Sequence, residues 1–261
     1  MCLVIVALAA HSRYATVIAA NRDEFHARAS CPAQWGNVHP FADVLAGRDL
    51  EAGGTWLGVR RDGRWALLTN VRGGRGSNKP NAPSRGDLVP AVLNQPAPPA
   101  AALATVMHNA SAYNGFNLLA GDAHGATWMS NRSDESRAIT TGVHGLSNAL
   151  LDTPWPKLAR TRAAVAAWAA QDSDDPASLF DLLADRACVP DAALPSTGVS
   201  LEWERLLSAP FIVSEAYGTR CSTVLAIEHS GNARWVERSY DKRGNTIGEV
   251  DVTWEVSRTL Y

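Results

Sequence analysis

Two apolar runs open the chain and are joined by a short polar segment. Residues 3–9 contain only Leu, Val, Ile and Ala, and residues 15–20 form a second run of similar composition. A strand that is buried on both faces has this continuous pattern, whereas a half-exposed strand alternates. Since residues 11–14 are polar or turn-forming, the two runs predict a hairpin of buried strands.

Further along, shorter apolar runs predict more strands and a central group of helices. The predicted strands are residues 55–59, 65–69, 113–120, 126–130, 222–228, 233–239 and 251–256. The predicted helices are residues 84–93, 100–109 and 153–170, with another starting at Asp175-Pro176. On the 153–170 helix, Leu158, Val165 and Trp168 share one face. Strands, then helices, then strands, without a linker or repeat, indicate one α+β domain over residues 1–261, with antiparallel sheets covered by helices.

Composition narrows the class of protein. The net charge of −2 argues against a nucleic-acid partner, and no apolar run is long enough to cross a bilayer. The four cysteines, at positions 2, 31, 188 and 221, form no CxxC pair, and no histidine lies in a metal-binding motif. We therefore expect free thiols in a cytoplasmic protein that holds no metal and no cofactor.

Cys2 is the residue with the clearest chemical potential, because it directly follows Met1. Removal of the methionine would leave a thiol and a free α-amine on one residue. The amine titrates near ~7.7–8.0 and the thiol near ~8.5, so Cys2 would carry both a nucleophile and a base. The alternative is that Cys2 is a small buried hydrophobic residue at the edge of a strand.

Four consecutive polar residues, Asn21 to Glu24, follow the second apolar run. In an extended chain Asn21 and Asp23 share one face, and Arg22 and Glu24 share the other. The hairpin returns all four toward the level of Cys2. A carboxylate there would hold a terminal amine, and an arginine would favour the thiolate. The alternative is a strand end with two ordinary ion pairs, which contribute little.

Three more polar residues interrupt apolar surroundings. Asn70 ends the 65–69 run, Asn148 precedes the long helix, and Arg220 precedes the 222–228 strand. Asparagine amides are neutral and directional, and therefore suit the stabilisation of an oxyanion. Asparagine also favours turns, so each position alone is weak evidence.

The segment after Asn70 is rich in Gly, Asn and Pro, which predicts a loop. It carries Arg72, Arg75, Lys79 and Arg85, with no acidic residue before Asp87. This pattern is typical of a solvated loop. The alternative is a mobile lip that meets an anionic group of a substrate.

Taken together, these residues resemble the NRDE family, also called the transport and Golgi organisation family. The matching segments span most of the chain: Met1-Cys2, residues 21–24, 53–58, 68–72, 84–86, 113–118 and 145–148. The resemblance implies the N-terminal nucleophile (Ntn) hydrolase fold, a four-layer αββα sandwich with two antiparallel sheets. Within that superfamily, the pattern of matching residues is similar to the choloylglycine hydrolase and penicillin V acylase branch, in which an N-terminal cysteine attacks an amide.

The resemblance also implies roles for individual residues. Cys2 matches the nucleophile, Asp23 matches an aspartate that orients the amine, and Asn148 matches an oxyanion asparagine. Asn70 and Arg220 match less closely. The role of Arg22, which belongs to the family's own motif, stays open.

Two functions compete at this stage. The first is a cysteine amidohydrolase that acts on a non-peptide amide or acyl compound. The second is a carrier of haem or an acyl-CoA-like ligand, since members of the family have been linked to haem trafficking and lipid metabolism. In either case Asn21, Arg22, Glu24 and Arg72 are candidate binding residues. A scaffold with a merely buried Cys2 leaves the polar run unexplained, and the sequence leaves the oligomeric state open.

Overall fold

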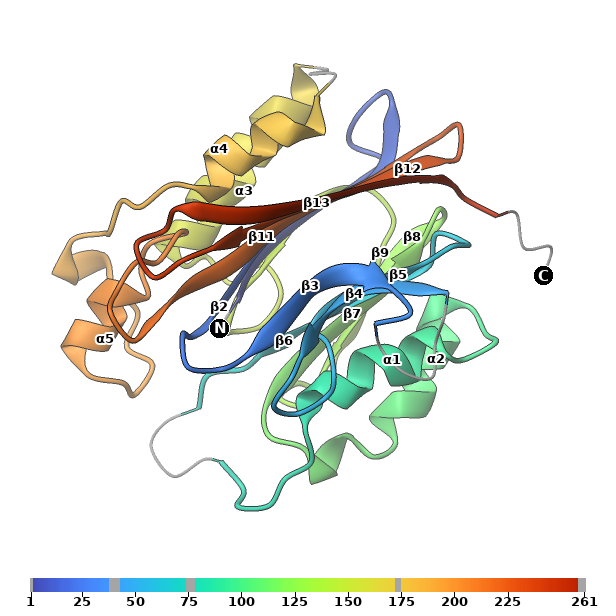
Figure 1. Cartoon of the computed structure of the whole chain (residues 1–261). Helices are drawn as coiled ribbons and strands as arrows, with labels where there is room; N and C mark the ends of the chain where they lie inside the picture. Colours follow the sequence, from blue (N-terminus) through green and yellow to red (C-terminus); the bar gives the residue numbers. More distant parts are fainter. Residues whose placement is uncertain (1, 38–42, 74–77, 172–174, 258–261) are drawn as a thin grey trace.

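The computed structural model describes residues 2–37, 43–73, 78–171 and 175–257. Two antiparallel sheets face each other, and helices cover the outer face of each sheet (Figure 1). The six-stranded sheet has the order β10-β1-β2-β11-β12-β13, and the seven-stranded sheet has the order β3-β4-β5-β6-β7-β8-β9. This confirms the predicted α+β class and the four αββα layers.

The six-stranded sheet contains the predicted hairpin. Its strands are β1 Cys2–Leu8, β2 Tyr14–Phe25, β10 Gly142–Leu146, β11 Tyr217–Glu228, β12 Asn232–Tyr240 and β13 Thr246–Glu255. Cys2 pairs with Arg22 and Leu8 pairs with Thr16. As predicted, residues 21–24 form the extended end of the second strand, and β2 continues to Phe25. It continues because β11 pairs with β2 along this whole stretch and supplies partners for its backbone.

The seven-stranded sheet was only partly predicted. Its strands are β3 Ser30–Trp35, β4 Val44–Asp49, β5 Leu57–Arg60, β6 Trp65–Asn70, β7 Phe116–Asp122, β8 Gly125–Ser130 and β9 Ser136–Ile139. The expected turn at Asp62-Gly63 joins β5 and β6, and Gly63 has φ of 82°, a conformation that favours glycine. The strands β3, β4, β9 and β10 were not predicted from the sequence.

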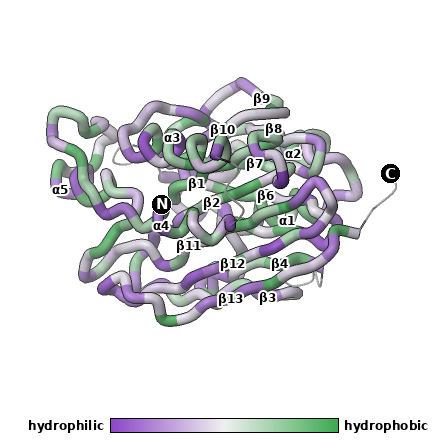
Figure 2. The backbone as a smooth tube through the Cα atoms, turned by 90° about the horizontal axis from the view of Figure 1, so that it is seen from above, coloured by the Kyte–Doolittle hydropathy of each residue, from purple (hydrophilic) through white to green (hydrophobic). Residues whose placement is uncertain are grey.

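The helices divide between the two outer layers. The helices are α1 Leu88–Leu93, α2 Pro99–Met107, α3 Pro156–Ala170, α4 Leu179–Leu183 and α5 Leu201–Leu206. Contacts place α1 and α2 on the seven-stranded sheet, and α3 and α4 on the six-stranded sheet. The predicted 84–93 helix is divided into a 3-10 turn, capped by Ser84, and α1. At one end of the sandwich α5 projects away from α1 and α2 (Figures 1 and 2).

Side-chain alternation along β1 and β2 separates two cores. Val4, Val6, Ile18 and Ala20 face the other sheet, whereas the intervening residues, such as Leu3, pack against α3 and α4. The sheet-to-sheet core continues to Cys2, so Cys2, Arg22 and Glu24 point between the sheets while Asn21 and Asp23 point toward the helices. Within the described ranges, no helix has the length and apolar content needed to span a membrane.

Candidate active site

A cleft of about 390 Å³ lies where β1 begins and where β2 continues beyond it. Both sheets contribute to its lining. Of the residues singled out in the sequence, the cleft brings together Cys2, Arg22, Asp23, Glu24 and Asn70. Asn21, Arg72, Asn148 and Arg220 do not line it.

Cys2 is partly exposed in this cleft. Burial raises the pKa of the Cys2 thiol, the Asp23 carboxylate raises it further, and the Arg22 guanidinium lowers it. The balance leaves the thiol protonated at neutral pH. On the backbone, the Ser147 hydroxyl donates a hydrogen bond of 3.0 Å to the Cys2 carbonyl, so the segment after β10 fixes the start of β1.

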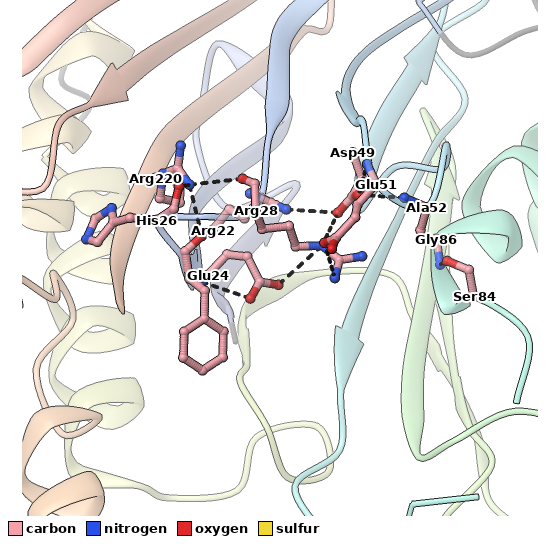
Figure 3. Close-up of polar contacts among 11 residues, drawn as sticks. Arg22, Glu24, His26, Arg28, Asp49, Glu51, Ala52, Ser84, Gly86 and Arg220 are labelled. Carbon is pink, nitrogen blue, oxygen red and sulfur yellow. Dashed lines mark hydrogen bonds and ion pairs between the residues drawn. The ribbon is translucent and has the colours of Figure 1, made fainter. Parts of the chain in front are cut away.

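On the sheet-to-sheet face of β2, Arg22 belongs to a network centred on Asp49 (Figure 3). Arg22 Nη2 and Arg28 Nε lie 3.1 Å and 2.6 Å from the same Asp49 oxygen. The Arg22 guanidinium also lies 4.4 Å from the centre of the Trp56 ring. Burial acts to raise the pKa of Asp49, but hydrogen bonds from Arg28 and the Ala52 N–H outweigh it and lower the pKa. Asp49 therefore remains ionised and holds Arg22 in the cleft wall.

On the helix-facing side of β2, the polar side chains are buried and hydrogen-bonded within the fold. The Thr219 hydroxyl donates to Asp23 Oδ1 over 2.7 Å and accepts the Ile212 N–H. Burial raises the pKa of Asp23, and the Lys157 ammonium opposes this. Asn21 donates to the carbonyls of Leu183 and Pro210. The Asn21 side chain thus ties β2 to the end of α4 and to the segment before β11.

Asn70 and Asn148 are joined to each other, although only Asn70 lines the cleft. Asn148 Nδ2 donates a hydrogen bond of 2.8 Å to the Asn70 carbonyl. The Asn148 carbonyl accepts the Arg72 N–H. The side-chain amide of Asn70 makes no hydrogen bond with any residue that the structure describes, which leaves its N–H groups available to a ligand. One N–H of the Asn148 amide is already used.

The two remaining arginines of the sequence prediction hold parts of the fold together. Arg72 Nη1 lies 2.9 Å from Glu204 in α5, and its guanidinium lies 5.0 Å from the Trp155 ring. Arg220 Nη1 donates to three backbone carbonyls just after β2 or at its end, those of Phe25, His26 and Arg28 (Figure 3). The positively charged loop is also divided: Lys79 is exposed, Arg85 reaches the cleft, and Arg75 lies outside the described residues.

Arg85 is a cleft arginine that no carboxylate of the described residues neutralises. Its Nη1 donates to the Gly115 carbonyl over 3.0 Å. No carboxylate in the described part of the chain lies within ion-pair distance of its guanidinium. Burial lowers the pKa of Arg85, while the charges of Glu24 and of a Cys2 thiolate raise it. The guanidinium is therefore positioned to meet an anion in the cleft.

Two glycines join the walls that carry Trp56 and Arg85. A Cβ on Gly54 would lie only 2.4 Å from the carbonyl carbon of Gly86, closer than atoms can approach. The Thr55 N–H donates to the Gly86 carbonyl over 3.0 Å. The backbones are thus in direct contact at Gly54 and Gly86, which explains the glycines at these two positions.

Comparison with known proteins gives the family. A family model described as Transport and Golgi organisation 2 matches residues 1–242. The chain belongs to this family. It is 34% identical over 244 residues to the mouse Transport and Golgi organization 2 homolog, a match that covers 87% of each chain, and the human homolog matches to the same extent. The predicted family resemblance is thereby confirmed.

Solved structures give the fold of this family member. It resembles two crystal structures of the conjugated bile acid hydrolase from Clostridium perfringens, each of a form with one substitution. Each match has a TM-score of 0.51 and 11% sequence identity, and covers 100% of this chain and 98% of the other. The fold is therefore Ntn-hydrolase-like, whereas activity is a property of the site and not of the fold.

Several residues of the site were missed by sequence reasoning. Asp49, Trp56 and Arg28 carry no local signal, because their roles come from contacts between the sheets. Lys157 did leave a signal. It lies four and eight residues before Thr161 and Val165, so it falls on the buried stripe of α3. Among the residues that the structure describes, no group of three or more potential metal ligands is found.

Proposed function

We propose that this family member is an N-terminal cysteine amidohydrolase or acylase that acts on a non-peptide amide or a related acyl compound. The observation that carries the proposal is the register of β1 and β2. Cys2 pairs with Arg22, and Asp23 is the next residue of β2. An α-amine on Cys2 would therefore lie beside the Asp23 carboxylate, while the thiol faces the cleft.

The protonated thiol supports a mechanism in which a base is needed. After removal of Met1, the α-amine takes the thiol proton as Sγ attacks the carbonyl carbon of the substrate. The Asn70 amide donates to the oxyanion, a stabilisation typically worth about 3 kcal/mol in acyl transfer. The amine then gives its proton to the leaving nitrogen as the C–N bond breaks. Water attacks the thioester and returns the free acid and the thiol.

The roles proposed for the other asparagine and for Arg22 follow from their contacts. Asn148 holds the Asn70 backbone through a hydrogen bond, so it acts on the oxyanion site at least indirectly. Arg22 places a positive charge next to Cys2 and so favours the thiolate as it forms.

The test compares two cysteines of the same protein. Intact mass before and after iodoacetamide, with tandem mass spectrometry of the N-terminus, reports Met1 removal and the labelled site. We expect Met1 to be absent and Cys2 to react faster than Cys188, which is exposed and serves as an internal control. In a screen of amide substrates, Cys2→Ala should abolish turnover, and so should acetylation of the α-amine. Retained Met1 with Cys2 slower than Cys188 would refute the proposal.

A second candidate, a carrier of haem or an acyl-CoA-like ligand, is favoured by the Arg85 charge in the cleft, which no described carboxylate neutralises. Such a carrier would bind its ligand stoichiometrically in the Cys2→Ala variant and would show no turnover. Arg85→Met should then weaken binding, whereas Lys79→Met, on the exposed loop, should leave it unchanged. Turnover that depends on Cys2 would exclude a purely carrying role.

A further inference from the structure

Arg132 is an exposed arginine that takes no part in the Cys2 cleft. It is the second residue after β8, and its guanidinium makes no hydrogen bond with any residue that the structure describes. No carboxylate of the described residues lies within ion-pair distance of it, although Asp134 and Glu135 follow it closely in the sequence. Its charge is therefore available to an anion from solution.

The surrounding chain holds Arg132 in a defined place. The Arg132 N–H donates to Ser130 Oγ over 3.2 Å, and the Ser130 hydroxyl donates to the Phe116 carbonyl over 2.7 Å. The preceding side chain, that of Asn131, accepts the Phe116 N–H over 2.8 Å. A Cβ on Gly115 would lie only 2.8 Å from Arg132 Nε, so the arginine side chain rests against the glycine backbone. Both the backbone and the side chain of Arg132 are thus fixed by their neighbours.

Arg132 lines a hollow of about 480 Å³ beside the Cys2 cleft. The two are neighbours, because Asn148 lines the hollow and donates a hydrogen bond to the carbonyl of Asn70, which lines the cleft. The hollow and the cleft have no lining residue in common. The hollow is therefore a separate place at which a ligand can lie.

The lining of this hollow suits an organic anion. It contains a second guanidinium, that of Arg72, which is paired with Glu204, and no acidic residue of the described chain lines it. Leu150 and Trp155 add apolar and aromatic surface. Hydroxyl groups come from Thr153, Ser196 and Thr197. Guanidinium and hydroxyl groups next to an apolar wall are the surroundings that bind a carboxylate or phosphate on an apolar body.

We propose that the hollow binds a small organic anion, a carboxylate or phosphate group on an apolar body, with Arg132 as the principal cation. The inference goes beyond the proposed function, because the hollow contains no residue of the Cys2 cleft and its ligand needs no amine at Cys2. The planar guanidinium of Arg132 donates to the oxyanion group, and the apolar body packs on Leu150 and Trp155. The ligand then lies beside Asn148, one hydrogen bond away from Asn70 and the cleft.

The experiment is a ligand-observed NMR titration with phenyl phosphate, benzoate and benzyl alcohol at constant ionic strength. None of the three is an amide, so binding is measured without turnover. We expect the two anions to bind roughly tenfold more tightly than the neutral alcohol, and Arg132→Met to weaken their binding roughly tenfold. Arg160→Met removes the same charge from the exposed side of α3 and is the matched control, which should leave all three affinities unchanged.

Arg85→Met tests the competing place for these anions, the Cys2 cleft. If the anions bind in the hollow, this variant keeps their affinity. Anion affinity that survives Arg132→Met, or that is lost only in Arg85→Met, would overturn the inference. Equal binding of benzyl alcohol, or no binding of either anion, would overturn it too. Thermal melting shows that each variant is folded. An unreactive Cys2 would end the proposed hydrolase function but would leave binding in the hollow intact, so the two failures are distinct.

Discussion

The two faces of β2 between Asn21 and Glu24 differ in how exposed their polar side chains are and in which groups bind them. Toward the other sheet, Arg22 and Glu24 line an open cleft, and Arg22 shares Asp49 with a partly exposed Arg28. Toward the helices, Asn21 and Asp23 are 1% exposed and use backbone carbonyls and hydroxyls as partners. One short segment thus presents charged side chains to the open cleft on one face and buried, hydrogen-bonded polar side chains on the other, of which Asp23 also reaches the cleft lining. Removing partners should cost more on the helix-facing side.

The largest effect should come from Asn21→Ala. The change leaves the carbonyls of Leu183 and Pro210 without their donor and removes the acceptor of the Ser222 hydroxyl. We expect the free energy of unfolding to fall by roughly 3 kcal/mol, because buried groups are left unsatisfied. Urea denaturation measures this free energy, with Asn232→Ala at the exposed start of β12 as the control. A loss no larger than that of the control would contradict the comparison.

The next effect is a pH dependence of the free energy of unfolding, which comes from a buried carboxyl group between the sheets. Glu237 of β12 is 1% exposed and accepts the Ala33 N–H and the Thr223 hydroxyl. Burial raises the pKa of Glu237 to about 7. Because the pKa of Glu237 in the folded protein lies above its unfolded value of ~4.3, the neutral carboxyl group stabilises the fold. This contribution to the free energy of unfolding is complete below pH ~4.3 and is lost as the pH rises through about 7.

Urea denaturation at several pH values tests this. We expect the free energy of unfolding to fall by about 3 kcal/mol between pH 5 and pH 8 in the unsubstituted protein. Glu237→Gln cannot ionise, so its stability should change less over the same range. Parallel pH dependences in the two proteins would show that Glu237 titrates normally.

Arg22→Met should have an intermediate effect. It removes the ion pair with Asp49 and the contact with the Trp56 ring, but Asp49 keeps Arg28 as a partner. We expect a loss of about 2 kcal/mol in the free energy of unfolding, and slower alkylation of Cys2 at pH 7. Alkylation at an unchanged rate would show that Arg22 does not act on the thiol.

The smallest effect should come from Arg28→Met on the same carboxylate. The Arg28 side chain is 32% exposed, against 5% for Arg22. Solvent screens its charge, so we expect a loss of about 1 kcal/mol or less. A loss larger than that of Arg22→Met would reverse the ranking by burial.

The sequence predicted the strands whose apolar character is local, and it placed Cys2 opposite the polar run through the hairpin. It placed residues 21–24 at the extended end of the second strand, but it did not show what holds Asn21 and Asp23, because their side-chain partners lie more than 150 positions away, at the end of α4, before β11 and on β11. The strand β4 was missed since only Val44, Leu45 and Ala46 are apolar before Gly47. Pairing with β3 and β5, rather than local propensity, makes it a strand.

The site shows the same limit. Cys2 and Asp23 were found because their positions follow from one hairpin. The sequence did not distinguish Arg85, which faces the cleft, from Arg72 and Lys79, because all three are basic residues of the same segment. Only the tertiary structure assigns Arg72 to Glu204, leaves Lys79 exposed and turns Arg85 toward Cys2.

The contact between Gly54 and Gly86 has a consequence for which ligands can enter. Because the two backbones touch, the walls that carry Trp56 and Arg85 form one rigid unit, and the spacing between them is fixed by main chain instead of by side-chain rotamers. A bulky ligand cannot force these walls apart by turning a side chain. Discrimination by size is then a property of the fold itself. A methyl group at Gly54, far smaller than any ligand, would be enough to push the Trp56 and Arg85 walls apart.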